Sequence, residues 1–232
     1  MQNTTVIYNA VWESGKKNEL DFWREWFKRK GALYQTARRL SSLFDFMIGD
    51  KKEVTIANLG AGAMSLIGDY RRDVKVKVVA SDLLATEFAK MRKEIGMPSP
   101  TPVEKQDMTN LTYKDGSFDI VFCANALDHC QDPYKALREM VRVCKSGGWI
   151  YLNHIAHEGR RQGYSGLHQW NIDVTDNGDC ILWNRMWSPD ETFLLSDIYP
   201  GFRTELKPYR KMTIIRSFVQ KNERFNSHLL YK

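Results

Sequence analysis

Hydrophobic residues between positions 54 and 152 form short runs of strand length, separated by stretches with helical spacing. The run at 118–124 is apolar except for Asp119, which is typical of a strand buried on both faces of a parallel sheet. Asp132 and Pro133 then supply a cap and a first turn for a helix. Strands that alternate with helices in this way predict a parallel sheet with right-handed crossovers. The predicted strands are residues 54–59, 76–80, 103–106, 118–124 and 149–152, and helices are expected from about residue 63, over 83–94 and after residue 133.

The segment before the first predicted strand has a helical pattern. Over residues 18–48, apolar side chains such as Trp23 and Phe27 recur at helical spacing, and Gly31 separates two predicted helices. We therefore predict an N-terminal helical cap over residues 1–50. This cap either covers a substrate pocket or only completes the core.

The pattern changes again after the fifth predicted strand. Glycine, histidine and tryptophan become frequent, and Asn177-Gly178 is a hairpin signal between two short strands. Two further strands are predicted at 202–206 and 212–219. We therefore assign residues 51–232 to one domain, with a substrate-binding insertion at about 154–200.

Length and composition limit the class of protein. A chain of 232 residues with 43% hydrophobic residues suits one α/β domain with additions. It has no apolar run of the about 20 residues that span a membrane, and its first residues lack the pattern of a secretory signal. The four cysteines show no paired metal-ligand spacing. We therefore expect a cytoplasmic protein with reduced thiols.

The formal net charge of +6 favours an anionic partner. A nucleic acid, a nucleotide-sugar and another phosphorylated substrate all meet this condition. The charge alone does not choose among them.

The stretch 54–62 ends in Gly60 and Gly62, which allow the backbone to approach a ligand closely. Asp82 follows about 20 residues later, at the end of the second predicted strand, where a carboxylate can accept both hydroxyls of a ribose. Two nucleoside ligands compete, a dinucleotide and S-adenosylmethionine (SAM). Ser65 stands where a dinucleotide fingerprint has its third glycine, which disfavours a pyrophosphate.

Three stretches resemble motifs of the class I SAM-dependent methyltransferases, in particular their small-molecule branch. Residues 57–62, Ala-Asn-Leu-Gly-Ala-Gly, resemble the first motif, and residues 79–82 resemble the second. The third match runs through 117–148 and includes Asp128-His129. This resemblance implies a Rossmann-like α/β fold with a mostly parallel seven-stranded sheet and helices on both faces. The N-terminal helical prefix and the insertion after strand five are additions to it.

The resemblance also implies how SAM is bound. Gly60 and Gly62 would line its methionine part, and Asp82 would hold the ribose hydroxyls. Two positions depart from the family, because Asn58 replaces an acidic residue and Met64 replaces a third glycine. The alternatives are weaker SAM binding, another carboxylate that takes over from the missing acidic residue, or a fold retained without catalysis. The residues assigned to the cofactor are Asn58, Gly60, Gly62, Asp82, Leu83, Asp107, Met108 and Asn125.

Histidines near the ends of strands four and five are candidates for a general base. His154 directly follows the fifth predicted strand and is the first candidate. His157 either orients it or takes the same role, and His129 belongs to a dipeptide that is common across the family. Asp128, His154 and His157 form an alternative metal set, but their spacing is loose and no metal is predicted.

The chemistry of the acceptor rests on weaker features. Tyr164, Trp170, Trp183 and Trp187 suit the C–H faces of sugars, base stacking or plain core packing. We predict O-methylation of a small molecule such as a sugar, a nucleotide-sugar or a polysaccharide precursor, in polysaccharide biosynthesis. RNA methylation and a non-catalytic binding subunit are the alternatives, although no RNA-binding module is recognisable. The oligomeric state is not determined.

Overall fold

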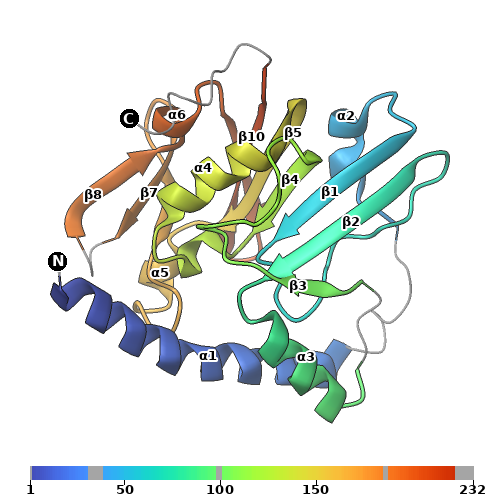
Figure 1. The fold of residues 1–232 in the computed structure, drawn as a ribbon. Coiled ribbons are helices and arrows are strands. Elements are labelled where there is room, and N and C mark those ends of the chain that lie inside the picture. Colours follow the sequence, from blue (N-terminus) through green and yellow to red (C-terminus); the bar gives the residue numbers. More distant parts are fainter. Residues whose placement is uncertain (1, 31–38, 98–100, 185–187, 223–232) are drawn as a thin grey trace.

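The computed structural model describes residues 2–30, 39–97, 101–184 and 188–222. Its central sheet consists of β1 (Glu53–Leu59), β2 (Lys75–Asp82), β3 (Val103–Lys105), β4 (Phe118–Ala124), β5 (Cys144–Ile155), β9 (Arg203–Tyr209) and β10 (Met212–Gln220). The strand order is β3-β2-β1-β4-β5-β10-β9 (Figure 1). Strands β1 to β5 pair in parallel, whereas β10 runs antiparallel to β5 and β9. The predicted mostly parallel seven-stranded sheet is confirmed.

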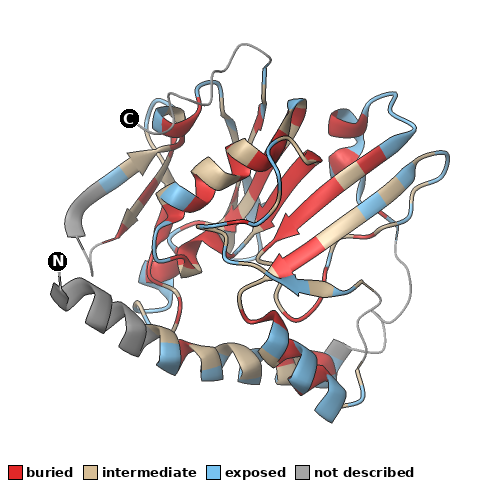
Figure 2. Ribbon diagram, viewed as in Figure 1, coloured by how far each residue is buried: buried red, intermediate tan, exposed pale blue. Residues whose placement is uncertain are grey.

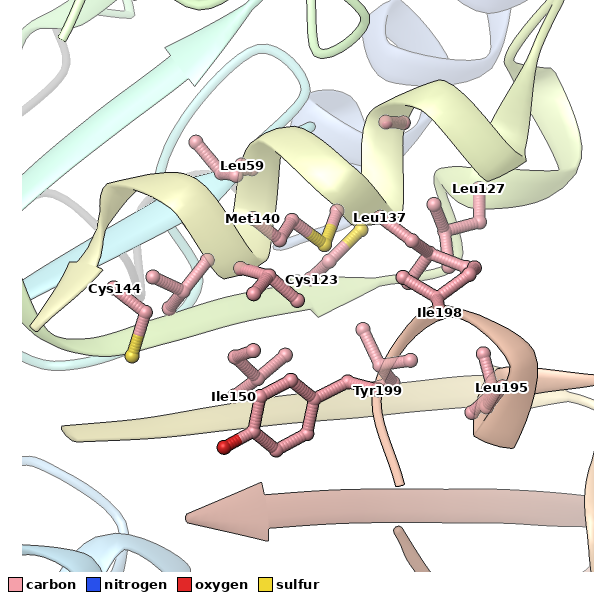
Figure 3. Close-up of a cluster of buried hydrophobic side chains, with 14 of the residues drawn as sticks. Leu59, Cys123, Leu127, Leu137, Met140, Cys144, Ile150, Leu195, Ile198 and Tyr199 are labelled. Carbon is pink, nitrogen blue, oxygen red and sulfur yellow. The ribbon is translucent and has the colours of Figure 1, made fainter. Parts of the chain in front are cut away.

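One face of this sheet is covered by α4 (Pro133–Val143) and α6 (Leu195–Ile198). Helix α4 begins at its cap Asp132, whose Oδ1 accepts a hydrogen bond from the backbone N–H of Lys135 at 2.8 Å. Its apolar side, including Met140, is buried in one cluster with Cys123 and Ile150 of the strands beneath (Figure 3). The sequence pattern of this helix therefore directs its packing.

The opposite face is covered by the 3-10 turn η2 (Ser42–Phe44) and helix α2 (Asp45–Ile48). Phe44 and Met47 are buried there against Ile56 and Phe122. These strand residues alternate with those that face α4, as the two-residue period of a strand requires. Figure 2 shows that burial is concentrated in the central strands.

A second, three-stranded sheet with the order β6-β7-β8 follows β5. It consists of β6 (Asn171–Val174), β7 (Cys180–Asn184) and β8 (Ser188–Leu194), and α5 (Glu158–Arg161) precedes it. Gly178, at a φ of 82°, forms part of the turn between β6 and β7. The predicted hairpin is confirmed, as are the two closing strands β9 and β10.

The prediction of a helix directly after the first strand is wrong, because residues 60–74 form turns, bends and two isolated bridges. Helix α1 (Gln2–Lys30) packs there instead and lies across the carboxyl ends of the strands, beside α3 (Ala85–Glu94) (Figure 1). Its Trp23 and Phe27 are buried in one cluster with Ala63 and Met64. A distant helix therefore buries the apolar residues that suggested a local one.

Two boundaries differ from the sequence-based expectation. Helix α1 begins at Gln2 rather than near residue 18, and the predicted break at Gly31 lies outside the described residues. Strand β5 extends through His154 to Ile155, because β10 pairs with it along this whole stretch. His154 therefore lies inside a strand and not after it.

None of the helices in the described ranges combines the length and the apolar character needed to cross a lipid bilayer.

Candidate functional site

A cavity of about 830 Å³ opens at the carboxyl ends of the strands, beneath α1. Gly60 and Gly62 line it after β1, Asp82 at the end of β2, Asp107 after β3 and Asn125 after β4. This is the edge at which open α/β sheets bind their ligands. The topology thus brings together residues that are far apart in the sequence.

The turn after β1 depends on two glycines in the left-handed region, Gly60 at a φ of 65° and Gly62 at 67°. A Cβ added at Gly60 would lie 2.3 Å from the Cβ of Ala126. A Cβ added at Gly62 would lie 2.2 Å from Cζ2 of Trp23 on α1. Both positions therefore require glycine for space as well as for backbone conformation.

Asp82 closes this turn through both of its carboxylate oxygens. Its Oδ2 accepts a hydrogen bond from the backbone N–H of Gly62 and its Oδ1 accepts one from that of Leu84, each at 2.9 Å. Burial raises the pKa of Asp82, although the two N–H donors act against this effect. A carboxylate has about four lone-pair directions, so Asp82 can still accept hydroxyl groups from the cavity.

The cavity wall continues through residues after β3 and β4. Asp107 accepts hydrogen bonds at its Oδ1 from the backbone N–H and the hydroxyl of Thr109, both at 2.8 Å. Asn125 has a φ of 47°, and its Oδ1 accepts a hydrogen bond from the backbone N–H of Ile155 at 2.9 Å. Leu83 and Met108 add apolar surface to the wall.

Asn58 is the exception among the residues assigned to the cofactor, because it does not line this cavity. Its side chain is buried, and its Nδ2 donates to the hydroxyl of Ser65 at 3.0 Å. Asn58 therefore shapes the turn from beneath.

The far end of the cavity holds two histidines. Nε2 of His129 lies 3.1 Å from Nδ1 of His168, and that Nδ1 lies 2.7 Å from Oδ2 of Asp128. Oε1 of Glu19, on α1, lies 4.0 Å from Nε2 of His129. This end is therefore polar and carries groups that can exchange protons.

The charges in this group shift one another's pKa values. Burial alone would raise the pKa of Asp128, but His129, His168 and His154 lower it to about 2. Burial also lowers the pKa of His168, whereas the hydrogen bond and charge of Asp128 raise it, and the net change is upward. Asp128 is therefore a fixed anion at neutral pH.

The family described as "Methyltransferase domain" matches residues 57–152. Two solved structures share the fold: a protein described as a methyltransferase, in complex with the Trm112 methyltransferase activator of Haloferax volcanii, and one described as an S-adenosyl-L-methionine-dependent methyltransferase of Methanococcus maripaludis. The first is 16% identical with a TM-score of 0.53, covering 90% of this chain and 98% of that one. The second is 13% identical with a TM-score of 0.51, covering 89% and 93%.

Residues 57–152 are a class I methyltransferase domain.

The cofactor of this family is SAM. Among curated relatives, the chain is similar to norajmaline N-methyltransferase of Rauvolfia serpentina, with 38% identity over 54% of this chain and 43% of the relative. It is also similar to the ubiquinone/menaquinone biosynthesis C-methyltransferase of Bdellovibrio bacteriovorus, with 29% identity over 56% of this chain and 60% of the relative. The chain thus spans about half the length of these relatives.

The methyltransferase domain brings only one of the three predicted catalytic histidines to the cavity, His129. His154 is 2% exposed within β5, neither ring nitrogen has a hydrogen-bond partner among the described residues, and burial lowers its pKa to about 4. His157 is half-exposed, and its Nδ1 lies 2.8 Å from Oδ1 of Asp173. Neither His154 nor His157 lines the cavity.

The tryptophans that line the cavity come from α1 rather than from the insertion. Trp12, Trp23 and Trp26 line it together with Glu19, whereas Tyr164, Trp170 and Trp183 do not. Trp187 lies outside the described residues. Sequence reasoning missed Trp12 because the predicted helix began near residue 18, and it did not single out Glu19 and Trp26 within that helix. Their spacing of seven, four and three residues, with Trp23 included, marks one helix face and was the available signal.

Proposed function

We propose that this chain transfers a methyl group from SAM to a small-molecule acceptor. One observation carries the proposal: a single cavity joins the Gly60–Gly62 turn and Asp82 to a polar end at His129, with α1 as its roof. Its volume of about 830 Å³ lies in the about 300–1,000 Å³ range of ligand pockets. A cofactor and a small acceptor can share such a space.

The residues of the cavity fit the cofactor. The cradle at Gly60 and Gly62 has no room for a Cβ, and the carboxylate of Asp82 retains acceptor capacity for ribose hydroxyls. Asp107 and Met108 would meet the base. When bound, SAM supplies an electrophilic methyl group. The chain's own task is to hold the acceptor in line with that group and to exclude water.

We propose His129 as the residue that activates the acceptor. It is the predicted catalytic histidine that lines the cavity, and His168 and Glu19 lie beside it. An imidazole can activate a hydroxyl either by accepting its proton or by holding a cation against it. His154 and His157, which sequence reasoning ranked higher, serve as the comparison in the test.

For the acceptor we propose a hydroxyl of a sugar, a nucleotide-sugar or a polysaccharide precursor. The indole faces of Trp12 and Trp26 suit sugar C–H surfaces, and Gln131 and Gln162 add polar groups to the same wall. The net charge of +6 supports a phosphorylated acceptor. The two relatives named above are an N-methyltransferase and a C-methyltransferase, so the methylated atom is itself part of the proposal.

RNA methylation is the second candidate and rests on the same positive charge. The contribution of α1 to the cavity wall, with Glu19 beside His129, favours a small molecule over a polymer. RNA retention that falls steeply with salt would favour the second candidate.

Calorimetry with SAM and with NAD tests the proposal. We expect SAM to bind in the micromolar range, about −8 kcal/mol, and NAD to bind far more weakly. Tighter binding of NAD would overturn the cofactor assignment, and no binding of SAM would favour a non-catalytic subunit. With sugars and nucleotide-sugars as acceptors, His129→Ala should lower turnover by about 10²–10⁴-fold and leave SAM affinity nearly intact. A loss in His154→Ala instead, with the fold intact, would return the role to His154.

We also propose that residues 1–50 act as a cap on a methyltransferase domain over 51–232, because α1 supplies the roof of the cavity. A cytoplasmic location is supported by the four cysteines, all of which are free and buried.

A further inference from the structure

Four side chains from three separate segments meet at the polar end of the cavity. Glu19 comes from α1, Asp128 and His129 come from η3 (Leu127–His129), and His168 comes from the segment before β6. Oε1 of Glu19, Nε2 of His129 and Nδ1 of His168 all lie within 4.8 Å of one another. Oδ2 of Asp128 lies 2.7 Å from Nδ1 of His168 and 3.5 Å from Nε2 of His129. Nε2 of His129, Nδ1 of His168 and Oδ2 of Asp128 thus form a tight triangle, and the carboxylate of Glu19 lies beside the two histidines.

Nδ1 of His168 has only one proton or one lone pair for its two short contacts, with Asp128 and with His129. If Nδ1 of His168 carries a proton, it donates to Asp128 at 2.7 Å and cannot also accept a hydrogen bond from His129. If Nδ1 is unprotonated, it accepts a hydrogen bond from His129 at 3.1 Å, but its lone pair then also faces the carboxylate of Asp128. In the first case Nε2 of His129 either shares the proton that Asp128 accepts or faces it with an N–H of its own, and in the second case two lone pairs face each other. A cation between them would satisfy all three atoms at once.

The spacing of the atoms also suits coordination. Ligand atoms that lie about 2.0–2.2 Å from one ion are about 3–4 Å from each other. The distances of 3.1 Å between His129 and His168 and 4.0 Å between His129 and Glu19 fall near this range. The side chains of Glu19, His129 and His168 are 18%, 19% and 26% exposed and all line the cavity. A coordination position can therefore remain open toward the acceptor.

We propose that Glu19, His129 and His168, with Asp128 at their side, bind one divalent transition-metal ion. Two imidazoles with carboxylates favour ions such as Zn²⁺ and Mn²⁺ over Mg²⁺ and Ca²⁺, which prefer oxygen ligands. The ion would also join α1 to the body of the domain, because Glu19 is its ligand from α1. This set differs from the His154–His157 set that the sequence suggested and disfavoured, since residue spacing cannot reveal ligands from three distant segments.

The role that we assign to the ion in the acceptor site rests on the proposed methyl transfer. A hydroxyl that binds the open position becomes more acidic, because a divalent cation stabilises the alkoxide. His129 would then activate the acceptor as a ligand of the ion rather than as a free base. The proton would leave to solvent or to a carboxylate oxygen.

Metal binding to the full chain, after removal of bound ions with EDTA, tests the site directly. Titration with Zn²⁺ and with Mn²⁺ should show one ion per chain, and Mg²⁺ should bind far more weakly. Glu19→Gln and His168→Ala should each weaken binding by about 10–100-fold or more, the range measured for groups that support metal ligands. Glu13→Gln is the matched control for the first variant, because Glu13 lies on α1 but is 69% exposed and pairs with Lys16. His157→Ala is the control for the second, since His157 lies away from the cavity.

Hydrogen exchange supplies a readout that does not depend on activity. The ion should slow amide exchange in α1 of the wild type and of Glu13→Gln, but not of Glu19→Gln. Absence of a stoichiometric transition-metal ion, equal affinity in Glu19→Gln and Glu13→Gln, or a preference for Mg²⁺ would each overturn the proposal. SAM titration of the same ion-free protein separates the two ideas. SAM binding without any ion site overturns the metal proposal alone, whereas loss of SAM binding overturns the proposed function.

Discussion

Trp23 of α1 lies directly on Gly62, with its Cζ2 atom 2.2 Å from the position that a Cβ of residue 62 would occupy. Trp23 is 7% exposed and shares a buried cluster with Phe27, Met64 and Phe88. The contact joins the N-terminal helix to the glycine turn at the floor of the cavity. The shape of the cavity therefore depends on a segment that lies outside the matched family region of residues 57–152.

The first prediction concerns this contact. Gly62→Ala places a methyl group inside the indole ring of Trp23 and forces alanine into a φ of 67°, so the free energy of unfolding should fall by about 1–3 kcal/mol or more. Gly96→Ala is a matched control, because Gly96 has the same φ of 67° with nothing within 4 Å of an added Cβ. Chemical denaturation measures both.

A double mutant separates the clash from the backbone strain. In a Trp23→Ala background, Gly62→Ala should cost no more than Gly96→Ala costs in the wild type, which gives an interaction energy of about 0.5–3 kcal/mol. Equal losses for Gly62→Ala in both backgrounds would contradict the contact.

The second prediction concerns Asp82. Asp82→Asn removes the charge and leaves only one acceptor oxygen for the N–H groups of Gly62 and Leu84. SAM affinity should fall by about 1.5–3 kcal/mol, the worth of a hydrogen bond to a charged group. Asp119→Asn is the control, because Asp119 holds Thr55 and Lys145 and does not line the cavity. Calorimetry that gives the same SAM affinity for wild type and a folded Asp82→Asn variant would remove Asp82 from the site.

The third prediction concerns Asn125, which combines a φ of 47° with a side-chain bond to the N–H of Ile155. Asn125→Ala loses the bond and leaves alanine in a left-handed conformation, so stability should fall by about 1–3 kcal/mol. Asn125→Gly loses the same bond without the strain and should cost less. Thermal unfolding compares the two variants, and a glycine variant that is less stable than the alanine variant would contradict the role of the φ angle.

The fourth prediction concerns the pH dependence of stability at His154. Burial lowers its pKa from 6.5 to about 4, against the raising effect of Asp128 and with a smaller lowering effect of His129. Between these pH values the unfolded chain binds a proton that the folded chain does not, so stability is lost as the pH falls. The total effect is about 3 kcal/mol at about 1.4 kcal/mol per pH unit.

His154→Leu should remove this loss and also raise stability at pH 7, because two unpaired ring nitrogens leave the interior. Denaturation in EDTA from pH 7 to 4 should show the advantage of the variant growing as the pH falls, since other ionisable groups are common to both proteins. Parallel curves would show that His154 titrates normally.

The hydrophobic pattern predicted the central sheet because strand period and helix period are local properties of the sequence. The run Phe118–Ala124, the cap Asp132 and the hairpin at Asn177-Gly178 each lie where they were expected. Local pattern failed after β1, where Ala63 and Met64 suggested a helix but are buried by Trp23 and Phe27 from another segment. An apolar residue in the sequence predicts that its side chain is buried, but it does not predict which element buries it.

The same distinction applies to the site. The sequence by itself determined the positions at strand ends, such as Gly60, Gly62 and Asp82, because parallel strands bring their carboxyl ends to one edge. Only the tertiary structure decided which side chains form the polar end of the cavity. Pairing with β10 extends β5 and buries His154, whereas the crossing of α1 over η3 brings Glu19 to His129 and His168. Contacts between segments that lie far apart in the sequence depend on how whole elements pack, and no local spacing encodes them.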